Sequence, residues 1–188
     1  GRIDGDMEQR LRDYFERTHY LSTVSSDADI MAKMPISLQG ELLTKVHGHW
    51  LERVPFLYHP ETRSWNFVAD LISRLKARIY PPSDSIRGAR LYVVHRGTAV
   101  FSGRSLTTGM VWGSDCLLSA AYLRSRNSAR AAGFLETFTI SRNPLIEVIE
   151  RNPETHRYAR RFVLSLTMRR MMLLALKAKR QKDMVSEL

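Results

Sequence analysis

The stretch Leu91-Tyr-Val-Val-His-Arg-Gly-Thr-Ala-Val-Phe101 decides the fold class of this 188-residue chain. Its two halves are rich in β-branched and aromatic residues, which favour strands, and Arg96-Gly97 separates them. We therefore predict a β-hairpin here. A further strand-like run spans Phe134 to Ile140. The centre of the chain is thus expected to hold a compact set of short strands.

Helical periodicity precedes this β-rich centre. Apolar residues recur every three or four positions, as on one face of a helix, and prolines interrupt the pattern. On this basis we expect helices over Met7–Phe15, from Asp27 to about Lys33, from Ile36 or Ser37 up to Pro55, and from Trp65 to Leu75.

Two helix start signals follow the strands. Asn143-Pro144 and Asn152-Pro153 each combine an N-cap residue with a proline at the first helical position. The second is expected to open a long helix to about Lys182. Helices, then short strands, then helices, without βαβ alternation, predict an α+β fold. Its core is expected to be an antiparallel, jelly-roll-like β-roll with flanking helices.

Composition leaves several kinds of partner open. The formal net charge of +10 is compatible with nucleic acid, anionic lipid or an acidic ligand. The single cysteine, Cys116, excludes an internal disulfide and fits a reducing compartment, where we expect it to be a small buried residue. The sequence has no apolar run of the roughly 18 residues that a membrane-spanning helix needs.

Four segments of the first third resemble one region of a known channel superfamily. They are Arg12-Asp-Tyr-Phe15, Asp29-Ile-Met-Ala-Lys-Met34, Leu38-Gln-Gly-Glu41 and Val54-Pro-Phe-Leu57. Their order and spacing are similar to the C-linker of cyclic-nucleotide-gated, hyperpolarisation-activated and ether-à-go-go-type channels. The resemblance implies helices that assemble around a fourfold axis below a pore.

The second half is similar to the cyclic-nucleotide-binding domain of the same channels. Leu91-Tyr-Val-Val-His-Arg-Gly97 matches the family pattern Y-F-I-x-x-G, and Trp112-Gly-Ser-Asp-Cys-Leu-Leu118 lies where the family has F-G-E-I-C-L-L. The resemblance implies C-linker helices over residues 1–53 and a cyclic-nucleotide-binding-type domain with a C-terminal lid helix over residues 54–188.

The resemblance also implies a ligand pocket, from which this sequence departs at two positions. The family glutamate that accepts a hydrogen bond from the ribose 2′-hydroxyl is replaced by Ser114. The family arginine that pairs with the cyclic phosphate falls on Ser125, between Arg124 and Arg126. We therefore expect cAMP or cGMP to bind weakly or not at all, and no other cofactor, unless a flanking arginine takes over the phosphate. The candidate ligand-binding residues are Gly113, Ser114, Cys116, Arg124, Ser125, Arg126, Asn127 and Ser128.

These features predict a cytosolic gating module of a tetrameric cation channel, either potassium-selective or non-selective. It is expected to assemble as a homo-tetramer through the C-linker. One alternative is a functional cAMP or cGMP sensor that gates the channel directly. Another is a soluble cyclic-nucleotide-dependent regulator, which would not carry the C-linker pattern. A nucleic-acid-binding protein has only the charge in its favour, since no recognition motif is present, and we expect no nucleic-acid partner.

Two further expectations concern chemistry and partners. No Ser/His/Asp or Cys/His arrangement and no metal-ligand spacing appears, so we expect neither an enzyme nor a metal site. His47 and His49 are expected to be surface or interface residues. From Arg157 to Lys182 the chain has nine Lys or Arg residues and no acid, with a methionine-rich apolar stretch. This segment is expected to be a lid helix with a solvated basic face, and calmodulin or anionic lipid is its candidate partner.

Overall fold

The computed structural model describes residues 34–186 and, before them, residues 5, 7–9, 11–12 and 15. The helices predicted over Met7–Phe15 and from Asp27 to Lys33 lie partly or wholly outside the described residues. The described helices are α2 (Ile36–Leu51), α3 (Trp65–Ser73), α4 (Arg142–Glu150) and α5 (Pro153–Ser186). The strands are β1 (Lys76–Tyr80), β2 (Ser85–Ile86), β3 (Arg90–Arg96), β4 (Ala99–Phe101), β5 (Arg104–Leu106), β6 (Val111–Trp112), β7 (Ala129–Ala131) and β8 (Leu135–Ser141).

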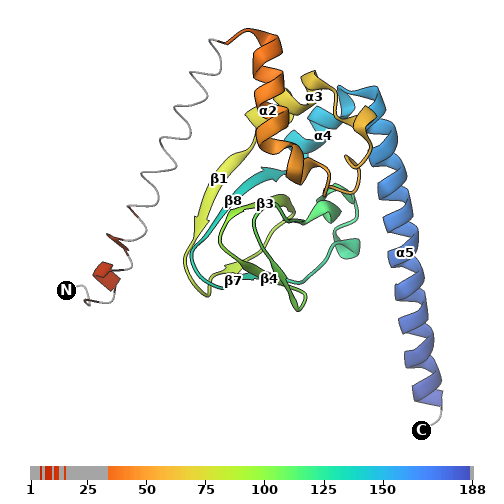
Figure 1. The fold of residues 1–188 in the computed structure, drawn as a ribbon. Helices are drawn as coiled ribbons and strands as arrows, with labels where there is room; N and C mark the ends of the chain where they lie inside the picture. Colours follow the sequence, from red (N-terminus) through yellow and green to blue (C-terminus); the bar gives the residue numbers. More distant parts are fainter. Residues whose placement is uncertain (1–4, 6, 10, 13–14, 16–33, 187–188) are drawn as a thin grey trace.

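The eight strands form two antiparallel four-stranded sheets. One sheet has the order β1-β8-β3-β6 and the other β2-β7-β4-β5. The longest pairing joins β3 to β8, with Leu91 opposite Ile140 and Val93 opposite Phe138. Helices α2, α3 and α4 gather at one end of these sheets, and α5 runs alongside them (Figure 1). The predicted α+β fold with an antiparallel β-roll and a long C-terminal helix is confirmed.

The hairpin predicted between Leu91 and Phe101 is wrong. Strand β3 pairs with β6 and β8, whereas β4 pairs with β5 and β7 in the other sheet. Gly97 lies between them at φ +94°, and a Cβ there would approach the Phe134 carbonyl oxygen to 2.3 Å. Only glycine tolerates this backbone conformation and this close approach. The chain therefore turns a corner from one sheet to the other at Gly97.

The helix start signals were correct at one site and wrong at the other. Helix α5 begins at Pro153 as predicted, although the Asn152 side-chain amide donates to the Val148 carbonyl, 2.9 Å away, in the preceding helix. Helix α4 begins at Arg142, with Ser141 rather than Asn143 at the N-cap. The reason is that Ser141 is also the last residue of β8, so the strand leads directly into the helix.

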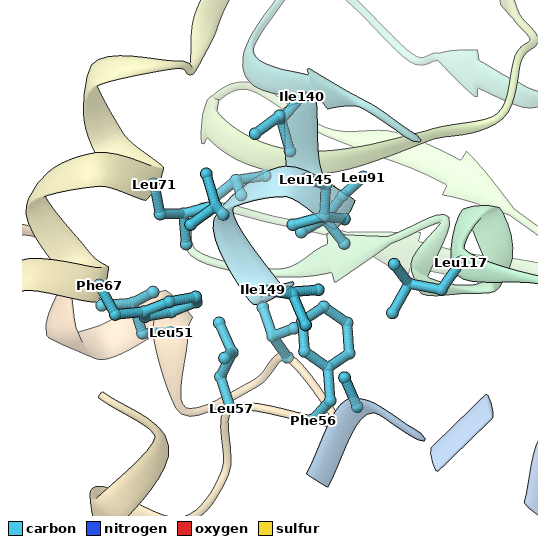
Figure 2. Packing of buried hydrophobic residues seen from close by; sticks show 14 of the residues in the cluster. Leu51, Phe56, Leu57, Phe67, Leu71, Leu91, Leu117, Ile140, Leu145 and Ile149 are labelled. Carbon is cyan, nitrogen blue, oxygen red and sulfur yellow. The ribbon is translucent and has the colours of Figure 1, made fainter. Parts of the chain in front are cut away.

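A hydrophobic core joins the helical end to the sheets. Trp50 and Leu51, at the end of α2, pack in the same cluster as Leu71 of α3, Leu145 of α4 and Leu91 of β3. Figure 2 shows α4 in the middle of this cluster, with side chains from α2, α3 and β3 converging on it. Because α2 and the β-roll share one core, a rearrangement of the roll is mechanically connected to α2. The domain boundary at residue 53 stays a prediction.

Helix α2 also contacts the roll through a histidine. The Trp50 indole N–H donates to His47 Nδ1 at 3.1 Å, and the His47 ring meets Phe138 of β8 edge-on, with centroids 6.2 Å apart. His47 is thus partly buried between α2 and β8 of the same chain, and a contact with another subunit stays a prediction.

Helix α5 is docked only along its first half. The buried Thr155 hydroxyl donates to the Thr62 carbonyl at 2.8 Å, and the Phe162 ring packs on Phe56 with centroids 5.8 Å apart. Beyond Arg170, every α5 residue up to Asp183 is exposed. The second half of the helix therefore makes little contact with the roll (Figure 1).

Candidate functional site

The candidate site is the segment between β6 and β7, which we call the cassette (residues 113–128). It begins at Gly113, whose φ is +81° and where an added Cβ would lie 2.1 Å from the Arg90 carbonyl oxygen. The glycine turns the chain out of β6 into the short 3-10 helix η2 (Ser114–Leu117). A second 3-10 turn, η3 (Ala121–Leu123), follows before β7. All eight predicted site residues lie in this continuous segment.

Cys116 anchors η2 in the core. Its side chain is buried, and its amide donates to the Gly113 carbonyl at 2.9 Å. Burial, and next the charge of Asp115, raise the pKa of the Cys116 thiol to about 12. The prediction of a small buried residue is confirmed, and the thiol is neutral at physiological pH.

Arg124 forms hydrogen bonds to the backbone of the cassette itself. Its Nε donates to the Leu118 carbonyl at 2.9 Å and its Nη2 to the Ser119 carbonyl at 3.2 Å. These bonds hold the guanidinium against the backbone of its own loop. Arg126, in contrast, is exposed. Of the two arginines that flank the predicted phosphate position, one is therefore already engaged and the other faces solvent.

Asn127 makes two further polar contacts in the cassette. The Asn127 amide N–H donates to Ser125 Oγ at 3.3 Å, and its side-chain Nδ2 donates to Ser102 Oγ at 2.8 Å, in the turn after β4. Ser114 is partly exposed at the start of η2, and Ser128 is partly exposed just before β7. The ligand-binding roles given to these residues stay predictions.

Asp115 is a cassette residue that the sequence did not single out. Its Oδ2 accepts a hydrogen bond from the Ser125 backbone N–H at 2.6 Å and pairs with Arg170 Nη1 of α5 at 2.9 Å. Arg170 Nη1 also donates to the Leu123 carbonyl. The one available signal was that Asp115 stands where the F-G-E-I-C-L-L pattern has isoleucine. A partly buried carboxylate at a position that is apolar in the family pattern is expected to have a hydrogen-bond or ion-pair partner.

Among the described residues, no helix is long and apolar enough to cross a membrane. Nor does this part of the chain bring together three or more His, Cys, Asp or Glu side chains that could hold a metal ion.

Comparison with known proteins places this arrangement in context. No protein-family model matches the chain. The potassium/sodium hyperpolarization-activated cyclic nucleotide-gated channel 1 of Rattus norvegicus is 25% identical over an alignment of 166 positions, which covers 83% of this chain and 18% of the relative. This chain is homologous to one region of such channels.

Other channel homologues give the same result. A cyclic nucleotide-gated cation channel subunit of Drosophila melanogaster is 25% identical over 81% of this chain and 25% of its own length. The cyclic nucleotide-gated channel beta-3 of Canis lupus familiaris is 22% identical over 82% of this chain and 21% of its own length. The chain thus spans only about a fifth to a quarter of the channels that it matches.

Proposed function

We propose that this chain is the cytosolic gating module of a cation channel and acts through conformational coupling, not catalysis. The observation that carries the proposal is the match of about four-fifths of the chain to hyperpolarization-activated and cyclic nucleotide-gated channels. The shared core supports it, because Trp50 and Leu51 at the end of α2 pack in the same cluster as residues of the β-roll. A change in the position of α5 or the cassette would then shift α2 and bias the pore above it.

We further propose that the cassette binds cAMP and cGMP weakly or not at all. The two family groups that recognise ribose and phosphate are serines here, Ser114 and Ser125. Arg124 is engaged with backbone carbonyls. The Ser125 N–H is held by the Asp115 carboxylate, whose charge would repel a phosphate. Direct nucleotide gating would need Arg126 to turn inward and replace these groups.

Calorimetric titration of cAMP and cGMP tests this proposal. We expect the wild type to show no binding, or binding weaker than micromolar. The variant Ser114→Glu/Ser125→Arg restores the family groups, and Asp115→Ile added to it removes the competing carboxylate. Binding by the triple variant alone would establish an intact pocket that has lost its ligand groups. Micromolar binding by the wild type would contradict the proposal and favour a direct sensor.

We propose that α2 contacts a neighbouring subunit in a homo-tetramer. Leu38, Leu42 and Val46 lie at i, i+4 and i+8, on one face of α2, and their exposed fractions are 51%, 36% and 51%. An apolar stripe of this kind is typical of a surface that another chain covers. Analytical ultracentrifugation of the wild type and of Leu42→Glu tests the contact. Self-association of the wild type that the variant loses is expected, and a strictly monomeric wild type at the highest soluble concentration would contradict it.

The second half of α5 favours one further partner, an acidic helix-binding protein of the calmodulin type. The side chains of Met171, Met172, Leu173 and Leu174 are 45–61% exposed and point to all sides of the helix. A protein that wraps the helix buries all of them, whereas a lipid surface covers one face. Fluorescence titration with Ca²⁺-calmodulin and, separately, with anionic vesicles distinguishes the two. Binding to vesicles alone would contradict this proposal.

A further inference from the structure

The cassette contains an anion of its own. We propose that the Asp115 carboxylate occupies the anion-binding position of the cassette in the ligand-free chain and, through its ion pair with Arg170, holds α5 against the cassette. The inference rests on the proposed function only in treating α5 as the lid helix.

Two donors meet the same carboxylate oxygen. The Ser125 N–H lies 2.6 Å and Arg170 Nη1 2.9 Å from Asp115 Oδ2. A backbone N–H together with a guanidinium is the donor set that proteins use for phosphate oxygens as well as for carboxylates. The backbone group comes from Ser125, the position that the resemblance gives to the phosphate arginine. The positive charge comes from α5, 55 residues from Asp115 along the chain.

The ion pair is sheltered from solvent. The Asp115 side chain is 16% exposed and the Arg170 side chain 26%. Pairs on the open surface contribute little, because water and salt screen them, but partial burial and two donors on one oxygen strengthen this one. Arg170 also donates to the Leu123 carbonyl, so one guanidinium connects η2, η3 and α5.

Arg170 lies at the point where α5 leaves the roll. It is partly buried, whereas the next residues, up to Asp183, are all exposed. Before it, Leu166 and Thr167 are only partly buried. Loss of the ion pair therefore leaves the helix from about Leu166 onward with few contacts to hold it. A phosphate-bearing ligand that displaced Asp115 from the Ser125 N–H would open the same contact.

Hydrogen–deuterium exchange of the ligand-free chain tests this inference. Asp115→Asn and Arg170→Gln should each raise amide exchange in residues 121–126 and around residues 163–170 by roughly tenfold or more, the effect of losing a charge-assisted hydrogen bond. The double variant should add little to either single one, because both remove the same interaction. Arg169→Gln is the matched control, since Arg169 is the exposed neighbour on the same helix. Exchange in both variants equal to that of the control would overturn the proposal.

Removing the carboxylate should also leave a vacant anion site. Asp115→Ala is expected to bind inorganic phosphate by calorimetry, whereas the wild type and Asp115→Ala/Arg170→Gln do not. Failure of Asp115→Ala to bind, in a variant that circular dichroism shows to be folded, would contradict a self-occupied anion site. The exchange experiment contains no nucleotide, so its failure leaves the gating proposal standing. Conversely, nucleotide binding by the wild type would overturn the proposed weak pocket without altering the exchange result.

Discussion

Gly113 is the position where a single methyl group should do most damage to the cassette. It has a left-handed backbone, φ +81°, and an added Cβ would lie 2.1 Å from the Arg90 carbonyl oxygen and 3.2 Å from its carbonyl carbon. Gly113→Ala therefore forces the start of η2 away from β3. Gly103 provides a matched control, because its φ is +76° and a Cβ there meets no atom within 4 Å.

Comparing the two variants separates the cost of the left-handed backbone from the cost of the steric clash with Arg90. A left-handed backbone costs alanine roughly 1–2 kcal/mol relative to glycine. Alanine also lowers the conformational entropy of the unfolded chain, which stabilises the folded state by about 0.4–1 kcal/mol. Gly103→Ala should therefore destabilise the protein by about 1 kcal/mol. Gly113→Ala has this cost as well. It must also weaken the β3–β6 pairing of Tyr92 with Trp112, whose rings stack 4.6 Å apart. One lost backbone hydrogen bond and one disturbed aromatic pair add about 2 kcal/mol.

Urea unfolding, followed by far-ultraviolet circular dichroism and by tryptophan fluorescence, measures both variants. We expect Gly113→Ala to lose about 2 kcal/mol more than Gly103→Ala, with an unchanged denaturant slope. Trp112 precedes Gly113, so the fluorescence of the folded variant should change as well. Equal stabilities of the two variants, within about 0.5 kcal/mol, would refute the claim that contact with Arg90 makes glycine necessary here.

Three further predictions concern titratable groups. Burial lowers the pKa of His47 from its ordinary 6.5 to about 4. The hydrogen bond from the Trp50 indole N–H to His47 Nδ1 also needs a neutral ring. The free energy of unfolding should therefore fall as the pH drops from 6.5 towards 4. The urea midpoint of His47→Gln should show a weaker decline, and an identical decline would contradict this. Burial raises the pKa of Tyr92 from 10.0 to about 12, so stability should fall as pH rises through this window, and Tyr92→Phe should flatten the fall. Cys116 should react with a thiol reagent only after unfolding, and labelling of the native chain at the rate of free cysteine would disprove its burial.

Local signals in the sequence located the described α-helices and the strands β3, β4 and β8, but not the shorter strands between them. The apolar spacing from Trp65 located α3, although the helix ends at Ser73 and not at Leu75. The structure adds an N-cap at Ser64, whose side chain accepts from the Phe67 backbone N–H at 3.4 Å. The Asn152-Pro153 signal located the start of α5 because proline at the first helical position needs no hydrogen-bond partner. These features depend on neighbours a few residues apart, which the sequence shows directly.

Features that depend on distant partners were missed. Arg96-Gly97 has the composition of a hairpin turn, but whether the next strand pairs with the previous one depends on the competition from β8, which lies some 40 residues later. The same holds for Asp115. Its two partners lie 10 and 55 residues away, and no periodicity connects them. The cassette could be located from the sequence, but the pairing of the Asp115 carboxylate with the Ser125 N–H and with Arg170 could not.

The departures from the family pattern in the cassette are best understood as one electrostatic change. Ser125 removes a positive charge from the loop, and Asp115 adds a negative one beside the same backbone N–H. Ser125 alone would leave a phosphate site without its positive charge, and Asp115 alone would pair with the loop arginine and neutralise it. Together they leave one carboxylate, and Arg170 of α5 supplies its counter-charge. Restoring an arginine at position 125 without removing Asp115 would therefore create an internal ion pair before it created a nucleotide site. For that reason the triple variant, and not the double one, is the informative test of the pocket.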